Sequence, residues 1–239
     1  IIFFLKNLSI LAKTNHETII LYRGYFEGTS MRAEEEEVVN AYSHLISAIL
    51  SAVFCIIFII RITESLQQLQ LFLLGAFSFW TFFASFLYHN SKSPKKRSRN
   101  LVLDRVGIYM MILASGLSFS LSLIDYNGKL VFSIVILIVG FLLITDYCSK
   151  KREDELYSIV SCLLFSILCI MPLTGIISDN SLVLPETIIM LTLSMIFYSA
   201  GVIFYTIDSK KWAHTAWHVL VSLGYASCFT AHLNAAHAF

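Results

Sequence analysis

Two histidines, His214 and His218, stand four residues apart near the start of an apolar segment at 213–234. Residues at i and i+4 share one helix face with their Cβ atoms about 6 Å apart, so both imidazoles can reach a single metal ion. His89 ends another apolar segment and offers a third imidazole. Three histidines leave one tetrahedral position of a zinc ion for water, which is the pattern of catalytic zinc sites. The sequence therefore raises a Zn²⁺ site at His89, His214 and His218, against the plainer interpretation of each as a hydrogen-bonded or interfacial histidine.

Two further polar residues are expected at the depth of these histidines. Asp104 lies at the start of the segment 103–123 and could orient or deprotonate a zinc-bound water, and Ser85 lies one turn before His89 and could hydrogen-bond to water or substrate. Each has a plainer interpretation, because a carboxylate also stabilises a helix N-terminus and a serine also packs where helices approach closely. The three histidines, Ser85 and Asp104 are all expected at about the same depth in the membrane, and this shared depth favours one joint site.

Seven apolar segments carry these residues. Apolar residues make up 57% of the 239 residues and charged residues only 14%, against about 25% charged in soluble domains. A membrane-spanning helix needs about 20 mostly apolar residues. We therefore predict an all-α membrane protein, a bundle of seven transmembrane helices at 41–60, 69–89, 103–123, 129–147, 157–178, 185–207 and 213–234.

Basic residues in the short loops set the predicted orientation, because Lys and Arg are enriched on the cytoplasmic side. Eleven basic residues follow the second, fourth and sixth segments, namely Lys92, Lys95, Lys96, Arg97, Arg99, Arg105, Lys150, Lys151, Arg152, Lys210 and Lys211. Only Arg61 and Lys129 lie on the other side. This asymmetry predicts a cytoplasmic N-terminus, an outside C-terminus, and a zinc site near the cytoplasmic face. The net charge of +1 gives no support for nucleic-acid binding.

The remaining features complete the predicted organisation. Residues 1–30 form an N-terminal extension of uncertain status, 31–234 a single transmembrane domain, and 235–239 a short tail. The four glutamates at 34–37 are expected to be a solvated helix face. Two polar stripes follow at i+4 spacing, and they favour an amphipathic entry helix with a helix–helix contact over a direct role in the site: Glu36, Asn40 and His44, and Ser43, Ser47 and Ser51.

The motifs together resemble the bacterial hemolysin III family, which is related to the progestin and adipoQ receptors and more distantly to the alkaline ceramidases. The resemblance covers about 31–234 and rests on "EEVVNAYSH" (36–44), "SFLYH" (85–89), "LDRVGIY" (103–109), "GVIFY" (201–205) and "HTAWHVLVSLG" (214–224). It implies a seven-helix bundle with zinc on His89, His214 and His218, and with Ser85 and Asp104 engaging its water. Arg105 stands where family members often have a histidine, so the resemblance does not extend to a substrate.

Three functions fit these residues. The first is a zinc-dependent hydrolase of lipid amide or ester bonds in the cell membrane, similar to ceramidases. The second is a membrane receptor or sensor in which the metal joins helices. The third is a pore-forming cytolysin, which the absence of alternating strands and strongly amphipathic segments disfavours. The sequence predicts membrane lipids as partners and leaves the substrate and the oligomeric state open.

Overall fold

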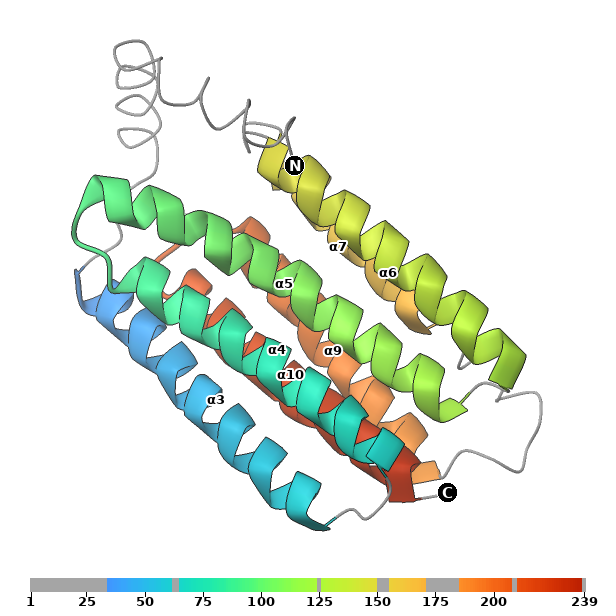
Figure 1. The fold of residues 1–239 in the computed structure, drawn as a ribbon. Helices are drawn as coiled ribbons and strands as arrows, with labels where there is room; N and C mark the ends of the chain where they lie inside the picture. The colour runs from blue at the N-terminus through green and yellow to red at the C-terminus, as the bar shows by residue number, and fades with distance from the viewer. Residues whose placement is uncertain are drawn as a thin grey trace. The chain divides into compact units, whose positions relative to one another are not determined.

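The computed structural model describes residues 34–61, 65–123, 126–149, 155–170, 185–207 and 210–237. The regular structure of these residues is helical throughout, in seven helices (Figure 1): α3 (Glu34–Arg61), α4 (Ser65–His89), α5 (Pro94–Leu123), α6 (Tyr126–Ser149), α7 (Glu155–Ile170), α9 (Pro185–Thr206) and α10 (Ala213–His237). The predicted extension at 1–30, the loop cations at 150–152 and the end of the tail at 238–239 lie outside the described residues.

Among the described residues, five helices are long and apolar enough to cross a membrane, over Glu34–Ile57, Gln68–His89, Pro94–Ser120, Leu130–Ser149 and Pro185–Thr206. The prediction of an all-α membrane protein is thereby confirmed, whereas the orientation of the termini stays a prediction. α10 has 25 residues, enough to span, but histidines and hydroxyl side chains along it lower its hydropathy. α7 is described as far as Ile170, and the rest of the predicted segment, 171–178, lies outside the described residues.

The helices pack in two groups that share α5. α4 lies along α5, α9 lies along α10, and α6 and α7 contact the other side of α5 (Figure 1). One buried cluster joins α3, α4, α5 and α10 around Leu74, Phe82 and Met111, and a second joins α5, α6 and α7 around Tyr109, Ile136 and Phe165. α5 therefore ties the helices that carry histidines to the rest of the bundle.

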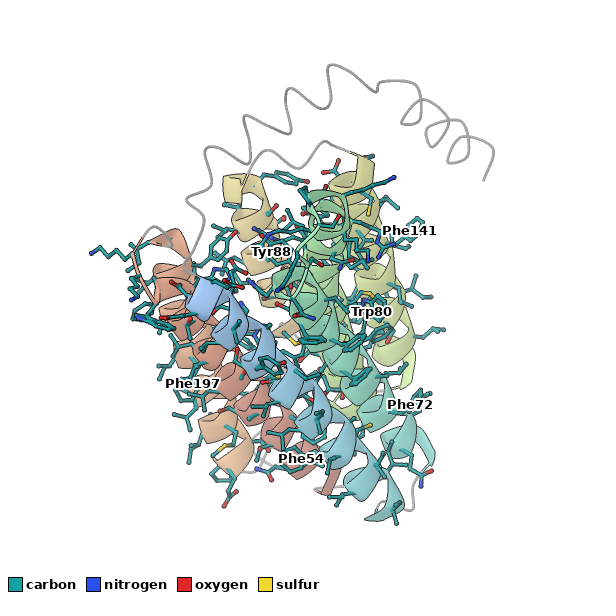
Figure 2. The ribbon with its side chains drawn as sticks, turned by 90° about the vertical axis from the view of Figure 1, so that its left-hand side faces the viewer. Phe54, Phe72, Trp80, Tyr88, Phe141 and Phe197 are labelled. Atoms are coloured by element: carbon teal, nitrogen blue, oxygen red, sulfur yellow. The ribbon has the colours of Figure 1, made fainter. Side chains whose placement is uncertain are left out.

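Apolar side chains also cover much of the outside of the bundle, as the sticks in Figure 2 show. Phe141 of α6 is 66% exposed and Phe72 of α4 is 54% exposed. Such a surface is unfavourable in water and suits the hydrocarbon of a lipid bilayer, which itself is apolar.

A tight contact between α4 and α5 sets their register. Thr81 Oγ1 donates to the carbonyl of Gly107 (2.7 Å), and Asn100 Nδ2 donates to the carbonyl of Leu87 (3.1 Å). A Cβ at Gly107 would lie 2.9 Å from Thr81 Cα, so glycine permits this approach. Since residue numbers rise in one helix as they fall in the other, Ser85 lies level with Asp104.

α10 begins with an unusual backbone conformation. Trp212 has φ 67°, in the left-handed region, and its carbonyl accepts the backbone N–H of Ala216 at 2.9 Å. An L-residue there costs about 1–2 kcal/mol, which packing elsewhere must offset. The turn starts the helix one residue before Ala213, so His214 and His218 fall in its first two turns.

Candidate metal centre

Three histidines from two helices meet inside the bundle. His89 is the last residue of α4, and His214 and His218 lie one turn apart on α10. They are 5%, 7% and 1% exposed. Each offers one ring nitrogen within 4.8 Å of the nitrogens of the other two. The helix ends thus bring the three histidines chosen from the sequence into one group.

The geometry of the rings fits a metal ion. His89 Nε2 and His214 Nε2 are 3.3 Å apart. Two ligands bonded at 2.0–2.1 Å with a tetrahedral angle are separated by about 3.3–3.4 Å, which matches this distance. The ring centroids of His89 and His214 each lie 4.7 Å from that of His218, and one nitrogen of His218 lies within 4.8 Å of the nitrogens of both. Imidazole nitrogens suit Zn, Cu, Fe and Ni, and the group could hold any of these ions.

Hydrogen bonds on the far side of two rings select the nitrogen that faces the centre. His89 Nδ1 is 2.8 Å from Glu37 Oε2, and His218 Nδ1 is 3.1 Å from the carbonyl oxygen of Asn40. An ionised carboxylate and a carbonyl only accept, so both Nδ1 atoms carry the proton and both Nε2 atoms keep their lone pair. Partners of this kind orient metal-binding histidines and raise their basicity.

α3 supplies these outer partners. Glu37 bridges His89 and Arg97, whose Nη2 is 2.9 Å from Glu37 Oε1, and the Arg97 guanidinium lies 4.5 Å above the Tyr88 ring. The charge of Glu37 is therefore balanced by Arg97 even when His89 is neutral. This ion pair lets an acid sit beside the histidines at low cost.

The His218 ring is positioned by stacking on its face as well as by the hydrogen bond at Nδ1. The His44 ring stacks on it at 3.7 Å between centroids and an interplanar angle of 11°, and Ser43 Oγ lies 3.4 Å from His218 Nδ1. Thr215 Oγ1 donates to Asn40 Oδ1 (2.6 Å), which fixes α3 against the first turn of α10. His44 does not belong to the group of converging ligand atoms, and its ring stacks on that of His218, so it is placed as a support of His218.

Ser85 and Asp104 are close to the histidines but outside the converging group. Ser85 is 3% exposed on α4, one turn before His89, and Asp104 is half-buried on α5 at the same level. The Asp104 carboxylate interacts electrostatically with His89. Neither belongs to the set of ligand atoms that meet within 4.8 Å. Their predicted roles toward water stay predictions.

Arg105, the departure noted in the sequence, is connected to the centre through the ring of Tyr205. Its guanidinium is 5.2 Å from the centroid of the Tyr205 ring, and that ring is 6.4 Å from the ring of His214. A cation and an aromatic residue thus border the His214 side of the group. Tyr205, the last residue of the "GVIFY" segment, is therefore the residue through which α9 approaches the centre.

The sequence prediction was wrong about part of α3. Glu34 and Glu35 are exposed as expected, but Glu36 is 3% exposed and Glu37 binds His89. Asn40 and His44, which were predicted to belong to an amphipathic entry helix, both contact His218. A usable signal was present, because Glu37, Asn40 and His44 recur at i, i+3 and i+7 and so share a helix face. The expected helix contact of the serine stripe is confirmed by Ser47 Oγ, 2.8 Å from Ser222 Oγ.

Comparison with known proteins identifies the family of this chain. A family model described as "Haemolysin-III related" matches residues 32–229. The chain belongs to the haemolysin-III related family. Within that family it is similar to Hemolysin-3 of Bacillus cereus, with 27% identity over 205 residues that cover 82% of this chain and 89% of the relative. It is 26% identical to the Hemolysin-3 homolog of Bacillus subtilis (strain 168), over 82% of this chain and 92% of the relative.

The family match spans the whole candidate metal centre. Glu37 of α3 and His218 of α10 both lie inside the matched range, as do all residues between them that contact the histidines. As a haemolysin-III related protein with several membrane-crossing helices, the chain is a multi-pass membrane protein whose buried histidine group could bind a metal.

Proposed function

We propose that this protein is a zinc-dependent hydrolase of the plasma membrane that cleaves an amide or ester bond of a membrane lipid, as in ceramide-like substrates. The observation that supports it most is the buried group of three histidines, whose nitrogens converge without a fourth protein ligand among the described His, Cys, Asp and Glu residues. Three protein ligands leave a position for water, which is the arrangement of catalytic zinc.

The residues around the histidines have complementary roles in this proposal. Zinc, when bound, lowers the pKa of its water to about 7 and polarises the substrate carbonyl. Asp104 accepts the proton of the attacking water and returns it to the leaving nitrogen or oxygen, while a C–O bond forms and the C–N or C–O bond to the leaving group breaks. Ser85 donates a hydrogen bond to the water or to the carbonyl. Glu37 and Asn40 hold the His89 and His218 rings in the required tautomer.

A metal-bearing receptor or sensor is the second candidate, and one observation favours it. The three histidines join α4 to α10, and both are held by α3. A metal at this point would couple the positions of three helices without any turnover. Relatives named Hemolysin-3 also suggest a cytolysin, which is the third candidate.

Metal analysis of the purified protein tests the shared premise of the first two functions. We expect about one zinc per chain in the wild type and nearly none in a His214→Ala/His218→Ala variant, because a single remaining imidazole does not retain the ion. His232→Ala is the matched control, since it removes another buried histidine from α10 but leaves the centre intact. Equal and low zinc in the wild type and the double variant would overturn the zinc proposal.

Turnover separates the hydrolase from the sensor. We expect release of fatty acid from ceramide-like lipids by the zinc-loaded protein, and a loss of about 100-fold or more in Asp104→Asn with zinc retained. A wild type that holds zinc but hydrolyses no lipid amide or ester would favour the sensor. Release of haemoglobin from erythrocytes without lipid hydrolysis would favour the cytolysin.

A further inference from the structure

Three polar residues of α3 form a column that leads to the histidine group. Glu36, Asn40 and His44 stand at i, i+4 and i+8 and therefore share one face of the helix. They are 3%, 0% and 5% exposed, so this face turns into the bundle. The column begins beside the exposed Glu35 in the first turn of α3, and it ends where the His44 ring stacks on the ring of His218. At 1.5 Å of rise per residue, it is about 12 Å long.

Each residue of the column has a buried polar atom without a hydrogen-bond partner among the described residues. These atoms are Glu36 Oε1, Asn40 Nδ2 and both ring nitrogens of His44. A buried polar group that is left unpaired costs free energy, so a native protein normally gives it a partner. Glu37, the neighbour of Glu36, has a partner at each of its two carboxylate oxygens. The column therefore retains the capacity to bind something that the helices themselves do not supply.

The unpartnered atoms suit a hydrated metal cation. A carboxylate oxygen and an imidazole nitrogen are both metal ligands, and the amide N–H of Asn40 can donate to a water molecule that the ion carries. Glu36 and His44 are two helical turns apart, so they cannot bind one ion at the same time. An ion would occupy the two residues in succession. A column of ligands with this spacing fits an ion in transit.

Apolar side chains border the column and give it a direction. Phe82 is fully buried and packs edge-on against the His44 ring, with the ring centroids 5.1 Å apart. The outer face of α3 carries exposed apolar residues such as Val39 and Ile46. A cation is unfavourable in such surroundings, since hydrocarbon does not replace its water. An ion that moves inward along the column therefore arrives at His218, whose ring lies 3.7 Å from that of His44.

We propose that the column of Glu36, Asn40 and His44 is the route by which a metal ion enters and leaves the histidine group. The ion leaves water at the exposed end of α3, binds the Glu36 carboxylate, passes Asn40 with part of its water, and moves from a His44 nitrogen to His218. His44 thus binds the ion only in passing, whereas the three histidines of the centre hold it at rest. The proposal rests on the metal centre of the proposed function and is independent of hydrolysis.

The rates of zinc uptake and release by the purified full chain in detergent test this route. Uptake is measured after the apo-protein is mixed with buffered free zinc, and release after the zinc-loaded protein is mixed with excess chromogenic chelator. Competition at equilibrium gives the affinity separately. The test variants are Glu36→Gln, which removes the carboxylate charge, and His44→Phe, which keeps a ring but removes both nitrogens. Glu35→Gln is the matched control, because it removes the same charge from an exposed position of α3. Circular dichroism and the thermal midpoint check that the variants fold.

We expect Glu36→Gln and His44→Phe each to slow uptake and release by a similar factor, roughly tenfold or more, and to leave the affinity within about twofold of the wild type. A residue on the route lowers the barrier in both directions and does not change the two end states, so both rates change together. Glu35→Gln should change neither rate by more than about twofold, because exposed charges act weakly at a distance.

Three results would overturn the proposal. Unchanged rates in Glu36→Gln, with normal zinc affinity, would exclude the route and leave the metal centre intact. A weaker affinity of Glu36→Gln with unchanged uptake would make Glu36 a part of the resting site instead of the route. A wild type that binds no zinc at equilibrium would contradict both the route and the zinc-dependent function, so the failures of the two proposals are distinguishable.

Discussion

Glu37 determines how His89 is presented, because its carboxylate accepts the His89 Nδ1 proton while Arg97 balances its charge. We expect Glu37→Gln to weaken metal binding by about 10–100-fold, the usual effect of removing an outer partner of a metal-bound histidine. Titration of the apo-protein with zinc measures this. Glu35→Gln removes the same charge from an exposed position of α3 and should bind metal as the wild type does. Equal affinities in the two variants would contradict the assigned role of Glu37.

His44 supports His218 through its ring face. Neither His44 nitrogen has a hydrogen-bond partner in the described part of the chain, whereas the stacking distance is only 3.7 Å. We expect His44→Phe to keep the wild-type metal content, since it retains a stacked ring and removes two buried unpaired nitrogens. His44→Ala should lower stability by about 2 kcal/mol and speed the loss of metal, because it leaves a cavity beside His218. Loss of metal in both variants would show that the nitrogens themselves are needed.

The histidines of the centre were accessible to sequence reasoning, and most of their partners were not. The i, i+4 spacing of His214 and His218 is local, and His89 follows from its position at a helix end. Glu37 is 52 residues from His89 in the chain; its spacing with Asn40 and His44 places it on their helix face, but the sequence does not show which distant helix that face contacts. His44 and Asn40 were noticed as a polar stripe, but the face to which that stripe turns depends on packing between distant helices.

The approach of α3 to α4 depends on the pairing of Gly75 with Cys55. A Cβ at Gly75 would overlap the Cys55 side chain, so Gly75→Ala should lower stability by about 1–3 kcal/mol although alanine favours helix. The exchanged pair Cys55→Gly/Gly75→Ala should recover most of this loss, because the added methyl then occupies the space of the thiol. Thermal unfolding in detergent gives both values. No recovery in the exchanged pair would contradict a steric cause.

The ends of a helix were predicted well where the helix coincides with a continuous apolar segment of the sequence. Three of the five membrane-crossing helices, α4, α6 and α9, begin and end within a few residues of the predicted segments. α3 and α5 start earlier than predicted, at Glu34 rather than 41 and at Pro94 rather than 103, and the early start of α3 carries Glu37 and Asn40 into the bundle. A hydropathy pattern omits the first turns of α3 because they are mostly polar, yet Glu37 and Asn40 there contact His89 and His218.

The orientation of the protein in the membrane can be measured by labelling the thiol of a native cysteine, Cys148. Of the five cysteines, Cys148 near the end of α6 is the exposed one, and it lies two residues before the predicted cytoplasmic cations at 150–152. We expect a membrane-impermeant maleimide to label it in inside-out vesicles and to leave it unlabelled in right-side-out vesicles. Cys148→Ser should abolish labelling in both. Labelling only from the outside would invert the predicted topology.

The separation of His89 and His214 along the chain has a consequence for biosynthesis. The two residues are 125 positions apart, so at about 5–20 residues per second the ribosome takes roughly 6–25 s to pass from one to the other. During that interval the membrane already contains His89 without the histidines of α10. Glu37, made earlier than His89, is available as its companion from the outset. Glu37 can therefore pair with His89 before α10 is made, and the group of three histidines is complete only once α10 has been synthesised.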